Sequence, residues 1–299
     1  MNTPKPILFL TGQNGLLGNQ IKQSLSDHYQ IIGLQRDTTS PDKPSWNYHQ
    51  MLQQFKIKAP AAVIHLAGAG IADKRWSQRH KKTIFDSRIK GTQWLANEIL
   101  NHDEQPIKFI CASAIGYYGD RPFEKLDEKS AKGDNFVADV AENWELAAKK
   151  LQSAHTQVIN LRFGMILSKH GGALKNMITP FKLGLGGRLG KGQQQYSWIS
   201  INDAVKAIRW LLDQANLSGV YNLTSPNPVT NQVFTQSLAQ TLKRPAFMHM
   251  PTFLVRFIFG EMADELLLAD THVLPTRLLT SGFEFDHPEL KPTLNKLLK

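Results

Sequence analysis

The sequence has very little cysteine and no long apolar run. Cys111 is the single cysteine among 299 residues, which excludes an intrachain disulfide and a cysteine metal cluster and agrees with a reducing cytoplasm. No apolar run approaches the roughly 20 residues that a helix needs to cross a bilayer, so we expect no membrane association. Residues 1–6 also lack the apolar core and small-residue cleavage site of a signal peptide. These absences favour a cytoplasmic protein that binds no metal.

The chain is basic, with a formal charge of +10, and its apolar fraction of 41 % suits a globular protein. Its length allows one large α/β domain or two small ones. A basic chain can bind nucleic acid or an anionic membrane, or its cations can surround an anionic cofactor. The only dense basic cluster is Lys74-Arg75 together with Arg79-His80-Lys81-Lys82. Because no nucleic-acid-binding motif is recognisable, we expect no specific nucleic acid partner.

A glycine-spaced loop follows the first apolar run, Ile7-Leu8-Phe9-Leu10. The loop reads Thr11-Gly12-Gln13-Asn14-Gly15-Leu16-Leu17-Gly18, and apolar residues then recur every four positions, as on one face of a helix. Gly12 permits a tight turn, Gly15 lets the backbone approach a pyrophosphate, and Gly18 lets the helix pack closely on the sheet. The helix start offers N–H groups to the anion. The loop therefore predicts a dinucleotide site, the alternative being a turn with incidental glycines.

Strand and helix signals alternate along the first half of the chain. The expected strands are Pro6–Leu10, Gln30–Leu34, Ala61–Leu66, Ile107–Ala112 and Val158–Phe163, and the expected helices are Leu16–Asp27, Tyr48–Phe55, Trp76–Leu100 and Phe136–Leu151. Such alternation predicts right-handed βαβ crossovers and an α/β fold with a doubly wound parallel sheet.

The second half is less regular. We expect a helix over Asn202–Leu212 capped by Asn202 or Asp203, a strand over Gly219–Leu223, a helix over Asn231–Leu242, and a helix start at Pro275. Gly171-Gly172 and Gly184–Gly192 are expected to be flexible, the latter as a mobile lid or a plain loop. Residues 1–165 and 196–223 should form the dinucleotide-binding core, and residues 166–195 and 224–299 a substrate-side subdomain.

The end of the second strand should choose between NAD and NADP. That strand ends Leu34-Gln35-Arg36-Asp37, and Arg36 is placed to pair with a 2′-phosphate, which favours NADP. Asp37, one residue later, is the alternative partner for the ribose of NAD. The third strand ends Leu66-Ala67-Gly68, whose small residues let backbone lie against the adenine ribose. His65 before them is expected to be a packed strand histidine.

Several of these segments resemble a known family. Thr11–Gly18, Leu66–Gly68, Cys111–Ser113 and Tyr196–Asp203 resemble an extended short-chain dehydrogenase/reductase. A closer resemblance, to the YfcH-like epimerase family, is carried by Ile71–Trp76, Ser113–Gly119, Pro180–Gly187, Gly260–Ala263 and Val273–Pro275. This atypical branch implies an NAD(P)-binding Rossmann fold, NADP as cofactor and a family-specific segment over the last ~50 residues. It does not imply a defined substrate.

The resemblance also shows what is missing. Short-chain reductases use a Tyr-x-x-x-Lys pair on one helix face, where the tyrosine acts as general acid. No tyrosine here has a lysine four residues later, and Phe136 and Val140 occupy the expected positions. Ser113 fits the family's substrate-orienting serine. Tyr117, in the loop after it, is the candidate proton donor, the alternative being an aromatic that packs over the pocket.

Two further residues are candidates for the cofactor site. Arg88 shares an apolar helix face with Ile84 and Leu95, and a buried arginine needs a partner. We expect it to reach the cofactor or an anionic substrate group, the alternative being a structural salt bridge. The backbone of Met165 is the candidate holder of the nicotinamide carboxamide.

Two functions follow. The first is an NADP-dependent oxidoreductase or nucleoside-diphosphate-sugar-epimerase-like enzyme acting on a small-molecule substrate. The alternative is a non-catalytic NADP(H)-binding redox sensor or regulator. The sequence leaves the oligomeric state open.

Overall fold

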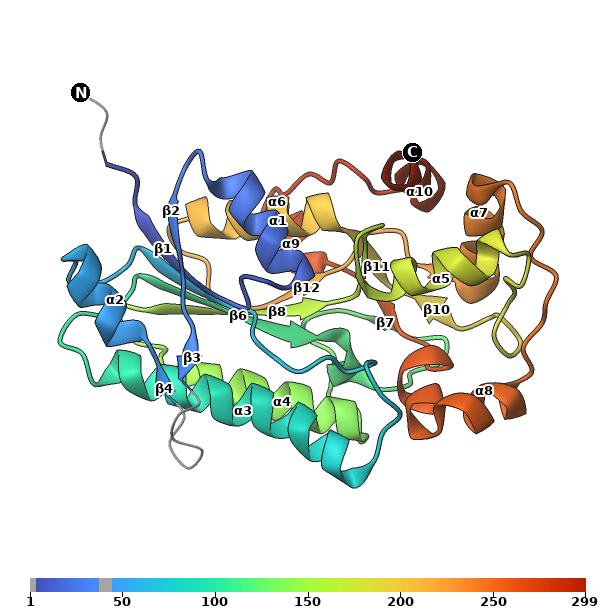
Figure 1. Cartoon of the computed structure of the whole chain (residues 1–299), viewed down its shortest axis with the longest axis horizontal. Coiled ribbons are helices and arrows are strands. Elements are labelled where there is room, and N and C mark those ends of the chain that lie inside the picture. The colour runs from blue at the N-terminus through green and yellow to red at the C-terminus, as the bar shows by residue number, and fades with distance from the viewer. Residues whose placement is uncertain (1–3, 38–44) are drawn as a thin grey trace.

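The computed structural model describes residues 4–37 and 45–299 of the chain. Its centre is a six-stranded parallel sheet with the strand order β12-β8-β6-β5-β1-β2 (Figure 1). The strands are β1 (Ile7–Thr11), β2 (Gln30–Gly33), β5 (Ala62–His65), β6 (Lys108–Ala114), β8 (Gln157–Phe163) and β12 (Gly219–Leu223). Each lies within two residues of a predicted strand, because buried apolar runs carried the signal.

Helices cover both faces of this sheet (Figure 1). On one face α1 (Leu16–Leu25) packs beside α6 (Ile201–Asp213), and on the other α3 (Gln78–Leu100) packs beside α4 (Phe136–Lys149). The short helix α2 (Tyr48–Phe55) lies against α3. Each face has its own apolar core, one containing Ile21 and the other Trp144. The prediction of a doubly wound Rossmann fold is confirmed.

The winding of the chain reverses at β1. Because β1 lies between β2 and β5, the chain leaves it first toward one edge of the sheet and then returns toward the other. Ligands of such sheets bind in the crevice at the carboxyl ends of the strands where this reversal occurs. The loop Gly12–Gly18 follows β1 and the segment Leu66–Gly70 follows β5, so both border the crevice.

The second half adds a smaller layer beside the sheet, shown at the right of Figure 1. Its helices are α5 (Gly172–Lys182), α7 (Asn231–Leu242) and α10 (Leu290–Leu298). Two short strand pairs join it to the core, β9 (Met165–Leu167) with β11 (Trp198–Ser200) and β10 (Gln195–Tyr196) with β13 (Val229–Thr230). A third apolar cluster around Trp198 and Phe234 fills this layer. The division into a dinucleotide-binding core and a substrate-side subdomain stays a prediction.

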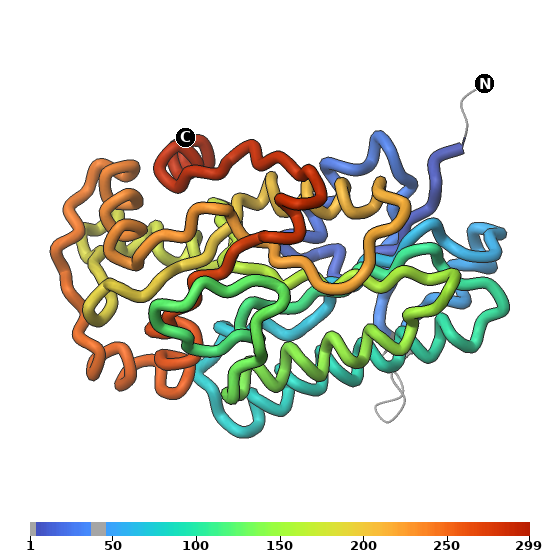
Figure 2. The backbone as a smooth tube through the Cα atoms, turned by 180° about the vertical axis from the view of Figure 1, so that it is seen from behind, coloured from blue at the N-terminus to red at the C-terminus, as the bar shows by residue number. Residues whose placement is uncertain are grey.

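The C-terminal segment runs from the smaller layer to the edge of the sheet and back to that layer, as Figure 2 shows from behind. It begins with α8 (Thr252–Phe259) and a π-helical turn, η2 (Ala263–Leu267). The strand β14 (His272–Val273) then pairs with β7 (Lys125–Leu126), and α9 (Thr276–Thr280) lies against β12. Pro275 immediately precedes α9, as predicted, and the chain ends with α10 packed on α7.

Two local expectations are corrected, and a third is untested. The cap of α6 is Ser200, because the helix begins one residue earlier than predicted and the Ser200 hydroxyl accepts the N–H of Asp203. Gly171 and Gly172 form the start of α5. The loop Gly184–Gly192 is bonded to a neighbouring segment, with Met248 N donating to Gly186 O at 3.2 Å and Met250 N to Arg188 O at 3.0 Å. Its movement as a lid stays a prediction.

Across the described residues, none of the helices combines the length and the apolar character that a bilayer crossing would require.

Candidate functional site

The glycine loop leaves no space for side chains where α1 meets β1. Gly12 has a φ of +70°, and a Cβ atom on Gly18 would lie 2.3 Å from the carbonyl oxygen of Gly12. Gly15 is the N-cap of α1, and its N–H donates to Gly12 O at 3.0 Å. Within the described residues no side chain caps the start of α1, and its first turn has no acid. The loop thus presents a bare helix N-terminus to the crevice, as an anion site requires.

Thr11 ties the end of β1 to the end of β5. Its Oγ1 accepts the N–H groups of Leu66 and Ala67 at 3.0 and 3.2 Å and lies 2.8 Å from His65 Nδ1. His65 Nε2 lies 3.0 Å from Thr92 Oγ1, which donates to Arg88 O at 2.6 Å. This direction of bonding assigns the Nε2–H tautomer to His65. Burial lowers the pKa of His65 to about 3, so it is a neutral, packed strand histidine as predicted.

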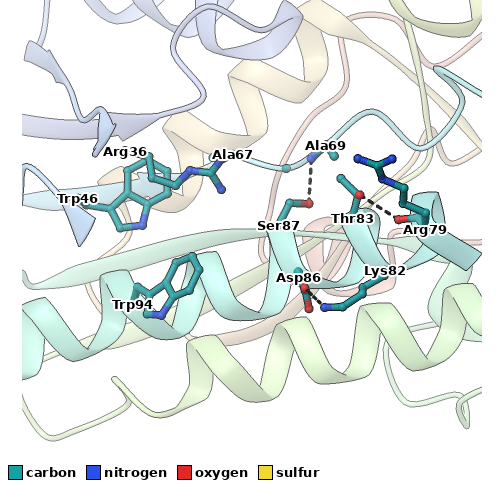
Figure 3. Close-up of a pocket in the computed structure, with 11 residues that line it drawn as sticks. Arg36, Trp46, Ala67, Ala69, Arg79, Lys82, Thr83, Asp86, Ser87 and Trp94 are labelled. Atoms are coloured by element: carbon teal, nitrogen blue, oxygen red, sulfur yellow. Dashed lines mark hydrogen bonds and ion pairs between the residues drawn. The ribbon is translucent and has the colours of Figure 1, made fainter. Parts of the chain in front are cut away.

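A cavity of about 640 Å³ lies beside the crevice, against the first half of α3 (Figure 3). Three predicted site residues line it, Arg36, Ala67 and Gly68. Eight further lining residues were not predicted as site residues: Trp46, Ala69, Arg79, Lys82, Thr83, Asp86, Ser87 and Trp94. Arg36 belongs to β3 (Arg36–Asp37), which pairs with β4 (Ser45–Trp46). Gln35, also predicted at this site, is not among the lining residues. Its backbone N–H donates to the side-chain oxygen Oδ1 of Asn47 at 2.8 Å.

The cavity is lined by three cations and one acid. Arg36 lies at one end and Arg79 at the other (Figure 3), and Lys82 is paired with Asp86. The basic cluster noted in the sequence is therefore divided. Arg79 and Lys82 face the cavity, whereas Lys81 pairs with Glu261 of the C-terminal segment at 2.6 Å. Two members of the cluster therefore line the cavity, and the interpretation of the chain's positive charge as a surface around an anionic cofactor stays a prediction.

Arg88 is half-buried and has no acidic partner within residues 4–37 and 45–299. Its Nη1 donates to Ala69 O at 2.9 Å and to Ile84 O at 3.3 Å, and its guanidinium lies over the Trp144 ring at 5.1 Å. Burial lowers its pKa to about 10. Among the described residues no carboxylate lies within ion-pair distance, so the structural salt bridge is absent. A half-buried cation whose hydrogen bonds go to two carbonyl groups keeps a positive charge that an anion could pair with, and its contact with a ligand stays a prediction.

Ser113 lies at the end of β6, 3 % exposed, in a buried polar network. Its hydroxyl donates to Glu145 Oε1 at 2.7 Å, and Glu145 receives Arg162 Nε and Nη2 at 2.7 and 2.8 Å. Arg162 Nη1 donates to Tyr118 OH at 3.0 Å. Burial opposes the charge on Arg162, but its bonds to Glu145 outweigh burial and hold its pKa above the usual value.

Tyr117 lies on top of this network, in the 3₁₀ turn η1 (Ile115–Tyr118). The Arg162 guanidinium stacks 3.3 Å from the centre of its ring, and Tyr118 packs edge-on at 5.4 Å. Tyr117 is half-buried, so it could still reach a ligand. The structure therefore brings Ser113 and Tyr117 onto one arginine–glutamate pair, and their catalytic roles stay predictions.

Glu145 and Arg162 were missed by the sequence analysis. The sequence does hold one indication of this pair, because the charged residue Arg162 lies within Val158–Phe163, a strand expected to be buried. A charge at such a position requires an opposite charge nearby.

Phe136 and Val140 fill the places where the tyrosine and lysine were expected. The Phe136 ring packs edge-on against Trp76 at 5.4 Å, and Val140 is buried with Ile84 and Ile89. Met165 begins β9, and its N–H already donates to Ser197 O at 2.9 Å. Because this N–H is already bonded, a contact with the nicotinamide carboxamide would have to use another atom of Met165. That contact stays a prediction.

Family models match most of the chain. Residues 8–224 match the NAD dependent epimerase/dehydratase family, and residues 250–297 match a domain of unknown function, DUF1731. An epimerase family protein of Staphylococcus aureus (strain MW2) is 37 % identical over 298 residues, covering 97 % of this chain and 98 % of its own. One from Mycobacterium tuberculosis is 36 % identical over 284 residues, covering 94 % of each.

Solved structures agree. The human epimerase family protein SDR39U1 (isoform2), solved with NADPH, is 29 % identical with a TM-score of 0.87, covering 97 % of this chain and 98 % of its own. A nucleoside-diphosphate sugar epimerase from Corynebacterium glutamicum is 29 % identical with a TM-score of 0.78, covering 99 % of this chain and 58 % of its own. The predicted resemblance to an epimerase family is confirmed, and the chain belongs to the NAD dependent epimerase/dehydratase family.

Proposed function

We propose that the chain binds NADP(H) and transfers hydride to or from a small-molecule substrate. The observation that carries the cofactor assignment is the position of Arg36, which lines the cavity at the switch point next to a glycine cradle and a bare helix N-terminus. The human relative solved with NADPH supports it.

The residues present fit each part of the dinucleotide. Arg36 would pair with the 2′-phosphate, and the loop from Thr11 to Gly18 would hold the pyrophosphate. Ala67 and Gly68 line the cavity and would lie along the adenine ribose, because neither has a side chain larger than a methyl group. Arg88 would supply a positive charge beneath the same segment. Leu66 and Gln35 would position the backbone around the site, because the N–H of Leu66 donates to Thr11 Oγ1 and the N–H of Gln35 donates to Asn47 Oδ1.

The affinities for NADPH and NADH, measured by fluorescence titration, test this assignment. We expect Arg36→Ala to weaken NADPH binding by about 10- to 100-fold, because a charge-assisted bond contributes about 1.5–3 kcal/mol, and to leave NADH binding unchanged. Arg209→Ala, on the opposite face of the sheet, is the control and should change neither. Equal affinities for the two cofactors that Arg36→Ala does not alter would overturn the choice of NADP.

Bound NADPH would supply the hydride for reduction of a carbonyl. Tyr117 would give the proton to the carbonyl oxygen, with its ring held in place by the Arg162 guanidinium. Ser113 would orient the same oxygen only by releasing its bond to Glu145. Nucleoside-diphosphate sugars are the proposed substrate class, in keeping with the name of the Corynebacterium glutamicum relative.

A second function, NADP(H) binding without turnover as a redox sensor or regulator, is favoured by one observation. The positions expected to hold the tyrosine and lysine, Phe136 and Val140, are packed into an apolar cluster. Loss of NADPH absorbance with a panel of carbonyls and nucleotide sugars separates the two functions. Turnover that Tyr117→Phe abolishes while NADPH binding persists supports the enzyme, whereas binding without oxidation across the panel supports the sensor.

A further inference from the structure

The guanidinium of Arg88 has one edge of hydrogen-bond donors that the described residues leave unused. Its Nη1 donates to the carbonyl oxygens of Ala69 and Ile84. Across residues 4–37 and 45–299, neither Nε nor Nη2 has an acceptor, and the side chain is half-buried. The N–H bonds of Nε and Nη2 run parallel along one edge of the planar group and can hold two neighbouring oxygen atoms. Arg88 therefore suits a ligand that offers two adjacent acceptors.

Three elements hold this guanidinium in place. It belongs to α3, it lies over the Trp144 ring of α4 at 5.1 Å, and its Nη1 is bonded to the segment after β5. A Cβ atom on Gly68 would be 3.4 Å from Arg88 Cζ, so the guanidinium lies directly against the backbone of that segment. A side chain held in this way loses little freedom when a ligand binds.

The order of the strands determines which part of a bound dinucleotide lies near Arg88. Arg36 follows β2, the glycine loop follows β1, and Ser113 lies near the end of β6. In the proposed function these hold the 2′-phosphate, the pyrophosphate and the reacting carbonyl. Because β5 lies between β1 and β6, the ribose that joins the pyrophosphate to the nicotinamide should pass over the end of β5. Arg88 is bonded there, to Ala69.

Arg88 is also separate from the cavity that Arg36 borders. Figure 3 shows Arg36 at one end of that cavity, and Arg88 is not among the lining residues. Its guanidinium instead contacts Trp144, and the next residue, Glu145, accepts the hydroxyl of Ser113. Two successive residues of α4 therefore connect Arg88 and Ser113, which places Arg88 at the nicotinamide half of the crevice.

The other arginine of this half is already occupied. Each of the three nitrogens of Arg162 is bonded, Nε and Nη2 to Glu145 and Nη1 to the hydroxyl of Tyr118. Arg162 is also only 3 % exposed. Of these two arginines, Arg88 is the one with donors left for a ligand.

We propose that Arg88 holds the nicotinamide ribose of the cofactor, with Nε and Nη2 donating to its two neighbouring hydroxyl oxygens. This inference rests on the proposed binding of NADP(H) and goes beyond it, because it assigns the half of the cofactor that Arg36 does not reach. A cation on α3 would then fix the nicotinamide beside Ser113, whereas α4 presents the apolar Val140 to Ile84 and Ile89.

A series of four ligands, each longer than the one before, tests the assignment by calorimetry. The ligands are adenosine 2′,5′-bisphosphate, 2′-phospho-ADP, 2′-phospho-ADP-ribose and NADPH. We expect Arg88→Met to leave the affinities for the first two within about twofold and to weaken the last two by about 10- to 100-fold, because only those contain the second ribose. An ionic strength of about 0.15 M screens distant charges. Arg36→Ala should weaken all four.

Two further variants separate this contact from a structural role. Arg88→Lys keeps the charge without the two-pronged edge and should retain part of the affinity for the last two ligands. Lys90→Met, at an exposed cation two residues along α3, is the matched control and should change none of the four. Circular dichroism and the unchanged binding of the bisphosphate show that Arg88→Met is folded.

Each other pattern overturns the assignment. A loss that begins with 2′-phospho-ADP would place Arg88 at the pyrophosphate, and a loss confined to NADPH would place it at the nicotinamide ring. Equal losses for all four ligands would indicate a purely structural role, and no loss would leave Arg88 to the substrate. If the wild type binds none of the four, the proposed function itself fails, which is distinct from these outcomes.

Discussion

Among single residues, two glycines in helices have opposite surroundings. Gly18 lies in α1 where a Cβ atom would be 2.3 Å from Gly12 O and 2.8 Å from Gln13 Cα, and both atoms are backbone. Gly91 lies inside α3, where the same atom would meet nothing within 4 Å. The first glycine is therefore required by contact, and the second is not.

This contrast predicts opposite effects of alanine. Gly18→Ala should destabilise the fold by about 1–3 kcal/mol, as overpacking does, and abolish NADPH binding because α1 must move away from the loop. Gly91→Ala should stabilise by about 0.5–1 kcal/mol, since alanine is the better helix former. Urea unfolding followed by circular dichroism measures both. A Gly18→Ala protein as stable as the wild type would contradict the close contact between Gly18 and the backbone of Gly12 and Gln13.

At the scale of elements, helix α6 shows where a sequence pattern misleads. Asn202 and Asp203 are both capping residue types, yet the cap is the buried Ser200, whose hydroxyl accepts Asp203 N–H at 2.9 Å and donates to Asp203 Oδ2 at 3.0 Å. The carboxylate of Asp203 also receives the N–H groups of Asp286 and His287. The start of α6 therefore holds the C-terminal segment as well as its own first turn.

Removing this cap should be costly. We expect Ser200→Ala to lower the free energy of unfolding by about 1–2 kcal/mol, the usual effect of losing a serine cap. Asn202→Ala, at an exposed residue that is one of the two predicted caps, should cost nothing and so serves as the control. Thermal unfolding of both variants compares them, and equal losses would mean that Ser200 is not the cap.

At the scale of the whole molecule, the sheet and the helices on its two faces were predictable from sequence. Buried parallel strands read as apolar runs and amphipathic helices as a four-residue repeat, so both signals are local. The smaller layer was less predictable, because short strands such as β9 and β11 are defined by partners distant in sequence.

The residues of the candidate site also fall into those that a short segment of sequence could predict and those that it could not. The glycine loop and Arg36 could be named because their chemistry follows from one short segment. Trp94, Arg79 and Lys82 could not, since only the packing of α3 against the segment after β5 brings them to one cavity. The pairing of Glu145 with Arg162 likewise depends on α4 and β8 meeting in space.

The apolar cluster around Phe136 and Val140 also limits how the chain can be re-engineered. A lysine introduced at position 140 would place its ammonium group among the buried side chains of Ile84 and Ile89, and a buried charge without a partner is costly. A designed tyrosine and lysine at these two positions would therefore need further substitutions in the cluster, and catalysis by the present chain must use other side chains.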